Sequence, residues 1–127
     1  CFSYIDDCLS CMIPMLDQQN LNKQIINIGP DEEFVTVNKV VEICSNVTGL
    51  NLEAIYKEDR PREVKHATCS ADKARKLLNY QTKVSLKEGI RKTYDYIKKR
   101  GTKDFNYKIS IEIDNDLTPV TWKNKEI

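Results

Sequence analysis

The stretch of this sequence richest in possible chemistry is DRPREVKH, residues 59–66. It places Arg60 and Arg62 on either side of Pro61, with Glu63 immediately after them. A guanidinium group offers paired N–H donors that match phosphate oxygens, and proline fixes the local backbone so that a neighbouring side chain is presented at low entropic cost. The run therefore fits recognition of a diphosphate. A solvated charged loop without a ligand is the alternative that composition alone leaves open.

Two other groups of residues could do chemistry, but each has a simpler explanation. Cys8 and Cys11 would share one helical face and could ligate a metal, yet no second pair accompanies them and His66 is the only histidine, which favours buried thiols. Asp6 and Asp7 could act as an acid–base pair. Their place at a predicted helix start instead favours capping, in which a carboxylate accepts a hydrogen bond from a free backbone N–H.

The elements that must position these residues are predicted to be short strands alternating with helices. Residues 1–5 favour a strand and precede a helix that runs to about residue 17. Residues 24–28 form an apolar run closed by Gly29-Pro30, the pattern of a buried strand, and residues 52–56 indicate a second short strand. Apolar and polar residues alternate over 107–113, as in a half-buried strand. The fold class is therefore predicted to be mixed α/β.

Three further helices are predicted from their capping residues and apolar spacing. Thr36 caps a helix that ends at Gly49, and Ser70 precedes a short helix over residues 71–78. Ser85 and Glu88 form a capping box for a helix from residue 86 to about residue 99. The predicted buried face of that helix consists of Leu86, Ile90, Tyr94 and Ile97.

Length and composition narrow the class of protein. The chain has 127 residues, about one domain, and its 20 basic against 19 acidic residues give a net charge of +1, which does not call for nucleic acid or an anionic membrane. No apolar run of about 18 residues is present that could span a bilayer. The five scattered cysteines are odd in number and fit reduced thiols in the cytoplasm better than a disulfide framework.

Four short motifs, taken in order, resemble the C-terminal third of the extended short-chain dehydrogenase/reductases, within the NAD-dependent epimerase/dehydratase family. They are FSYIDD (residues 2–7), INIG (26–29), RPREV (60–64) and SADKARKLLNY (70–80). The nearest likeness within the family is to UDP-glucose 4-epimerase, with dTDP-glucose 4,6-dehydratase and UDP-glucuronate decarboxylase as relatives. Each motif alone is weak, whereas four in the right order are specific.

The resemblance implies substrate-binding roles for two residues. Arg60 would contact the diphosphate of a nucleotide sugar, and Glu63 would hydrogen-bond the ribose of the nucleotide. Many relatives have a small residue after the proline, where this chain has Arg62, so the shape of the loop is expected to differ. The family usually carries a further phosphate-binding arginine before the position of Phe2, and this sequence starts at Cys1.

The same resemblance implies NAD as the cofactor of the whole enzyme, but the sequence lacks the parts that would hold it. A dinucleotide site needs a Gly-rich turn between a strand and a helix, and the four glycines are widely spaced. The family's catalytic pair is a Tyr with a Lys four positions later. Tyr94 and Lys98 match that spacing but lie after the Arg-Pro loop, whereas the family's pair precedes it, so neither is expected to be catalytic.

The sequence therefore predicts the substrate-binding lobe of a Rossmann-type nucleotide-sugar enzyme, without a complete Rossmann domain. Residues 1–100 would form the lobe and residues 101–127 an extension with one strand. The lobe would bind a UDP- or dTDP-sugar and would not catalyse a reaction alone, and the start at Cys1 suggests a fragment. Expected partners are the missing N-terminal cofactor-binding domain and further copies of the chain, as a homo-oligomer or strand-exchanged dimer. The alternative is a free-standing, non-catalytic binding module that pairs with another chain.

Overall fold

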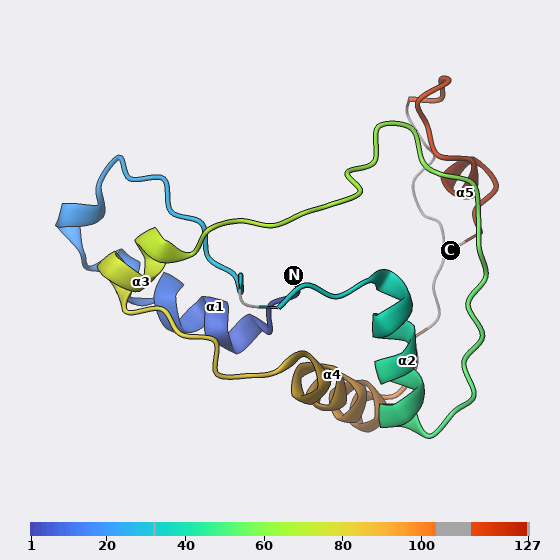
Figure 1. The fold of residues 1–127 in the computed structure, drawn as a ribbon, viewed down its shortest axis with the longest axis horizontal. Helices are drawn as coiled ribbons and strands as arrows, with labels where there is room; N and C mark the ends of the chain where they lie inside the picture. Colours follow the sequence, from blue (N-terminus) through green and yellow to red (C-terminus); the bar gives the residue numbers. More distant parts are fainter. Residues whose placement is uncertain (32, 104–112, 127) are drawn as a thin grey trace.

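A computed structural model describes residues 1–31, 33–103 and 113–126. In order, its longer helices are α1 (Ile5–Met12), α2 (Val37–Thr48), α3 (Asp72–Leu78) and α4 (Leu86–Arg100), followed by the short α5 (Val120–Lys123). Two 3₁₀ turns, η1 (Pro14–Leu16) and η2 (Gln19–Leu21), follow α1. Figure 1 shows α1 and α3 together at one end, α2 and α4 at the other, and a long loop between α2 and α3 running round the outside.

The capping residues define α2 and α4 as the sequence predicts. The Thr36 hydroxyl accepts a hydrogen bond from the Lys39 N–H at 3.1 Å, and α2 ends at Gly49, whose φ of 72° suits a residue without a Cβ. The Ser85 hydroxyl accepts from the Glu88 N–H at 3.3 Å and begins α4. The Glu88 carboxylate pairs with Arg91, one turn further along the helix.

The buried core is small and lies between α1, α3 and the segment before Gly29. It consists of Cys11, Ala71, Ala74 and Tyr80, with Ile26, Ile28 and Leu78 packed against it. Helix α2 packs against α4 in a second contact region. The buried Asp7 of α1 connects the two regions, because its carboxylate accepts hydrogen bonds from the Lys83 and Val84 N–H groups at 3.0 and 3.1 Å.

The predicted mixed α/β class with short strands is wrong for the residues described, which form helices and contain no strand. A strand needs a neighbouring strand to accept and donate its ladder hydrogen bonds, and the described part of the chain forms no such ladder with residues 24–28 or 52–56. Residues 1–4 are likewise irregular, and α1 already begins at Ile5. The predicted strand over 107–113 falls mainly on residues 107–112, outside the described part of the chain.

Burial alternates along residues 24–28, although the sequence there is a short apolar run. Ile26 and Ile28 pack on the core, while Ile25 between them is 85% exposed. The prediction of a strand buried on both faces is therefore wrong for Ile25, and the described residues give this segment no strand partner.

The fold leaves much apolar surface open. The accessible surface is 10765 Å² at a mass of 14.7 kDa, whereas a compact monomer of that mass exposes about 6,900 Å². One uncovered stripe follows α1 and η1 at helical spacing and consists of Ile5, Leu9, Met12, Ile13 and Leu16. Exposed apolar stripes of this kind are typical of surfaces that contact other protein.

Candidate functional site

The predicted substrate residues Arg60 and Glu63 lie on the long loop between α2 and α3. Every residue from 49 to 68 is exposed, and no helix or strand interrupts residues 49–71. The loop therefore presents its side chains to solvent, as a surface recognition loop does. In Figure 1 it passes α5 before it returns to α3.

Residues 60–63 form a β-turn with a specific geometry. The Glu63 N–H donates a hydrogen bond to the Arg60 carbonyl oxygen at 3.2 Å, which closes the turn around Pro61 and Arg62. Proline suits the second position because its φ is fixed near the required value. Arg62 at the third position has a φ of 58°, in the left-handed region that glycine adopts most easily. The expected departure from a small residue therefore falls on a position where a Cβ is unfavourable.

The turn brings the two predicted site residues together. Arg60 Nη1 lies 3.9 Å from Glu63 Oε1, and both side chains are about half exposed. An exposed contact of this length contributes little to stability, so it leaves the guanidinium free to exchange Glu63 for another anion. One cation and one acceptor on a single turn offer complementary contacts to a phosphate and to a hydroxyl group.

An ion pair closes the base of the turn. Lys65 Nζ donates to Asp59 Oδ2 at 2.8 Å. The hydrogen bond from Lys65 and its positive charge lower the pKa of Asp59, and the same contact raises the pKa of Lys65. Both groups therefore stay charged at neutral pH. The Lys65 ammonium faces Asp59, which makes Arg60 the better candidate for a phosphate contact.

Contacts at its two ends fix the loop to the rest of the chain. Near its start, the Leu52 N–H donates to the Ser45 hydroxyl of α2 at 2.9 Å. Lys57 Nζ lies 2.9 Å from Glu126 Oε2, which joins the loop to the segment after α5. Near its end, the amino terminus of Cys1 lies 3.4 Å from the Ala67 carbonyl oxygen.

A separate apolar groove lies where residues 2–4, α2 and α4 meet. It has a volume of about 390 Å³, and its lining includes Phe2, Tyr4, Cys44, Ile90, Tyr94 and Ile97. The predicted apolar face of α4 therefore borders a groove rather than a closed core. No residue of the Arg60 turn lines this groove, so the structure does not bring the predicted site residues to it.

The remaining candidates have structural roles in the described part of the chain. Tyr94 lines the apolar groove, and Lys98 Nζ lies 5.8 Å from the centre of its ring, a cation–π contact. Cys11 is buried in the core and Cys8 is half buried, both as free thiols. Within residues 1–31, 33–103 and 113–126, no cluster of three or more His, Cys, Asp or Glu side chains is suited to a metal ion. No helix in these residues is both long enough and apolar enough to span a membrane.

The role of Asp7 is the residue assignment that sequence reasoning missed. The helix-cap interpretation is wrong, because the cap position of α1 is Tyr4 and Asp7 bonds the chain just before α4. Local sequence gives no signal of a contact that spans 76 positions. One sequence feature did hint at a buried role for Asp7: it lies on the same face of an amphipathic helix as Cys11.

Comparison with known proteins confirms the resemblance to nucleotide-sugar epimerases. The chain is 31% identical over 97 residues to a UDP-glucuronate 4-epimerase of Thermodesulfobacterium geofontis, covering 76% of this chain and 29% of that protein. It is 28% identical over 96 residues to YtcB, an uncharacterized UDP-glucose epimerase of Bacillus subtilis, covering 76% and 30% of the two chains. A putative UDP-glucose 4-epimerase of Methanocaldococcus jannaschii is 31% identical over 97 residues, with the same coverage of 76% and 30%.

These relatives define the extent of the similarity. The chain spans about 30% of the length of the curated relatives that it matches. No family model matches the sequence, and no solved structure does. The relation therefore rests on pairwise similarity to three epimerases.

Proposed function

We propose that this chain, a relative of UDP-sugar epimerases over 96 or 97 of its residues, is the C-terminal, nucleotide-sugar-binding lobe of an NAD-dependent epimerase or dehydratase. The observation that carries the proposal is the 60–63 turn, which holds Arg60 and Glu63 within 3.9 Å of each other on an exposed loop. For the whole protein we propose an activity like that of UDP-glucose 4-epimerase.

In this proposal, Arg60 binds the diphosphate of a UDP- or dTDP-sugar and Glu63 accepts hydrogen bonds from the ribose hydroxyl groups. A guanidinium group can donate two parallel N–H bonds to phosphate oxygens, and an ionised carboxylate is an acceptor for two hydroxyl groups. The two contacts would orient the nucleotide so that the sugar extends away from the turn. Holding the substrate in one geometry is the contribution that a binding lobe makes to catalysis.

The chain's own residues do not fit NAD. Its four glycines, Gly29, Gly49, Gly89 and Gly101, do not form the Gly-rich turn that lets a backbone approach a pyrophosphate. We therefore assign cofactor binding and catalysis to another body, either a further part of the same polypeptide or a separate chain. The lobe alone is not expected to catalyse epimerisation, and turnover by the isolated chain with added NAD would contradict this assignment.

The uncovered apolar surface supports a partner for this lobe. The stripe along α1 and η1 and the unpaired segment 24–28 are the surfaces that a cofactor-binding domain would cover. Without that domain, we propose that copies of the chain associate as a homo-oligomer or exchange segments. The five free thiols support a reducing, cytoplasmic location.

The second candidate function is a free-standing, non-catalytic module that binds nucleotide sugars or pairs with a separate cofactor-binding chain. Similarity over about 30% of each relative is compatible with this candidate as well as with the first. Sequencing the DNA upstream of the Cys1 codon separates the two. An in-frame Gly-rich turn and a Tyr-x-x-x-Lys motif support the lobe of a larger enzyme, whereas a nearby stop codon and start codon support the module.

Calorimetric titration of the chain with UDP tests the function that both candidates share. Saturable binding that is stronger for UDP than for uridine is the expected result, because the proposed Arg60 contact requires the diphosphate. Equal binding of the two ligands, or none, would refute the diphosphate site.

A further inference from the structure

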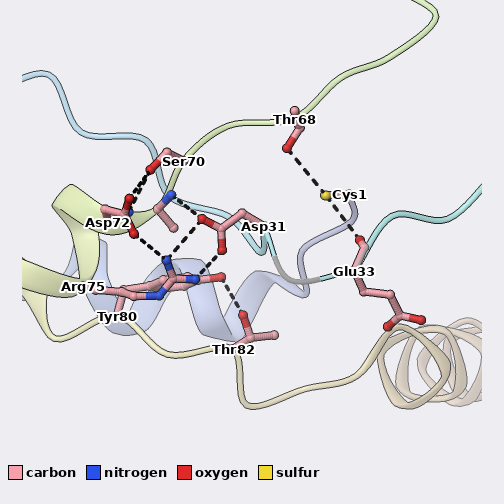
Figure 2. Close-up of polar contacts among 10 residues, drawn as sticks. Cys1, Asp31, Glu33, Thr68, Ser70, Asp72, Arg75, Tyr80 and Thr82 are labelled. Carbon is pink, nitrogen blue, oxygen red and sulfur yellow. Dashed lines mark hydrogen bonds and ion pairs between the residues drawn. The ribbon is translucent and has the colours of Figure 1, made fainter.

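Asp31 lies where the segment that follows the core meets the end of the Arg60 loop. Its Oδ2 accepts a hydrogen bond from the Ala71 N–H at 2.8 Å and another from Arg75 Nη1 at 3.2 Å, and Arg75 Nη2 donates to Oδ1. Figure 2 shows the Asp31 carboxylate facing the Arg75 guanidinium. One side chain therefore bonds the last residue of the loop and the helix that follows it.

Neighbouring contacts hold this arrangement in place. Arg75 also donates to Asp72 Oδ1 at 3.1 Å, and the Ser70 hydroxyl donates to Asp72 Oδ2 at 2.9 Å (Figure 2). Ala71 is fully buried in the core, so its backbone N–H has no access to water as a substitute partner. The Asp31 carboxylate thus provides the hydrogen-bond acceptor for the Ala71 N–H, which is buried in the core.

Elsewhere along the loop, the Leu52–Ser45 hydrogen bond and the Lys57–Glu126 ion pair join it to other segments, and both contacts are exposed. All residues from 49 to 68 are exposed, so packing does not determine the path of the chain between α2 and Ala71. Just before Ala71, Cys1 makes two longer contacts with the loop: its amino terminus lies 3.4 Å from the Ala67 carbonyl oxygen, and its thiol lies 3.9 Å from the Thr68 hydroxyl (Figure 2). Asp31 therefore makes the strongest polar contact at this end of the loop.

We infer that Asp31 is a positioning residue for the nucleotide-binding turn, and that it acts by fixing the end of the loop through the Ala71 N–H. This inference rests on the proposed function and extends it to a residue that does not touch the nucleotide. A loop with a fixed end spends more time in the arrangement that binds, and apparent affinity falls in proportion to the fraction of molecules in that arrangement. The ion pair with Arg75 contributes to stability, whereas the bond to the Ala71 N–H is the contact that fixes the loop.

Three variants separate the positioning role from the ion pair. Asp31→Ala removes the acceptor for Ala71 and the ion pair. Asp31→Asn keeps an oxygen that can accept from Ala71 but loses the charge, and Arg75→Gln leaves Asp31 in place without its partner. All three lower the melting temperature, whereas UDP affinity measured by calorimetry falls about 2- to 10-fold in Asp31→Ala alone, the range for loss of one hydrogen bond.

Hydrogen exchange of the Ala71 amide, followed by NMR, gives a readout without ligand. It is faster in Asp31→Ala and near the wild-type rate in Asp31→Asn and Arg75→Gln. Unchanged exchange in Asp31→Ala, or equal loss of UDP affinity in all three variants, would overturn the inference. A wild-type chain that binds no UDP would overturn the proposed function instead, and the exchange rates would still decide whether Asp31 anchors the loop.

Discussion

Replacing Arg60 with alanine is the perturbation that examines the proposed diphosphate contact most closely. Hydrogen bonds to charged groups contribute about 1.5 to 3 kcal/mol. In the free chain Arg60 lies 3.9 Å from Glu63, and giving up an exposed pair of this kind costs about 0.2 to 1 kcal/mol on binding. We therefore expect Arg60→Ala to weaken UDP binding by about 1.5 kcal/mol, the lower end of the range for a hydrogen bond to a charged group. This loss of binding free energy corresponds to about a tenfold increase in the Kd for UDP.

Calorimetric titration at constant ionic strength measures this change, with Arg91→Ala as the matched control. Arg91 lies on α4, where it pairs with Glu88 at 2.7 Å, and its removal changes the net charge by the same amount. Circular dichroism establishes that both variants keep their helices. Unchanged UDP binding by Arg60→Ala, or equal weakening by Arg91→Ala, would refute the reasoning, because the effect would then be absent or a general effect of charge.

Three further predictions concern stability and association. Hydrogen bonding to Arg75 lowers the pKa of Asp31 from 3.8 to about 2, so the ionised carboxylate stabilises the fold above pH 3.8 and this stabilisation is lost as the pH falls through about 2. Thermal melts between about pH 5 and pH 2 should show a falling melting temperature, and the fall should be smaller in Asp31→Asn. Arg62 and Gly49 both have left-handed backbone, which costs a residue with a Cβ about 1 to 2 kcal/mol and costs glycine little. Urea unfolding should therefore show Arg62→Gly more stable than the wild type and Gly49→Ala less stable, each by about this amount. A less stable Arg62→Gly or a more stable Gly49→Ala would contradict this. Leu16→Glu should reduce association in sedimentation experiments, since Leu16 is 85% exposed on the apolar stripe, and a wild-type chain that stays monomeric at all concentrations would disprove the role of that stripe.

Local signals in the sequence predicted local structure well. Thr36, Gly49 and Ser85 act within one helical turn, so their types and spacing were enough to place the ends of α2 and the start of α4. At residues 60–63 the sequence indicated only a loop around a rigid proline, and the structure specifies it as a β-turn closed by the bond from the Glu63 N–H to the Arg60 carbonyl oxygen. These features depend on few neighbours, and the sequence contains all of them.

Predictions that required distant partners failed or stayed open. The strand at residues 24–28 was inferred from a short apolar run closed by Gly29-Pro30, but pairing depends on a neighbouring strand that the described residues do not supply. Asp7 and Asp31 each bond backbone groups 40 or more positions away, and no periodicity shows such contacts. The nucleotide roles of Arg60 and Glu63 remain predictions, because they depend on a ligand and on the family resemblance rather than on local geometry.

The central claim is that residues 59–66 hold the diphosphate of a nucleotide. NMR titration of the ¹⁵N-labelled chain with UDP tests it most directly, since the rival site is the apolar groove lined by residues of α2 and α4. Our account predicts saturable shift changes concentrated at the amides of residues 59–66. Changes confined to Cys44, Thr48 and residues 86–97, or no saturable changes in a folded chain, would contradict it.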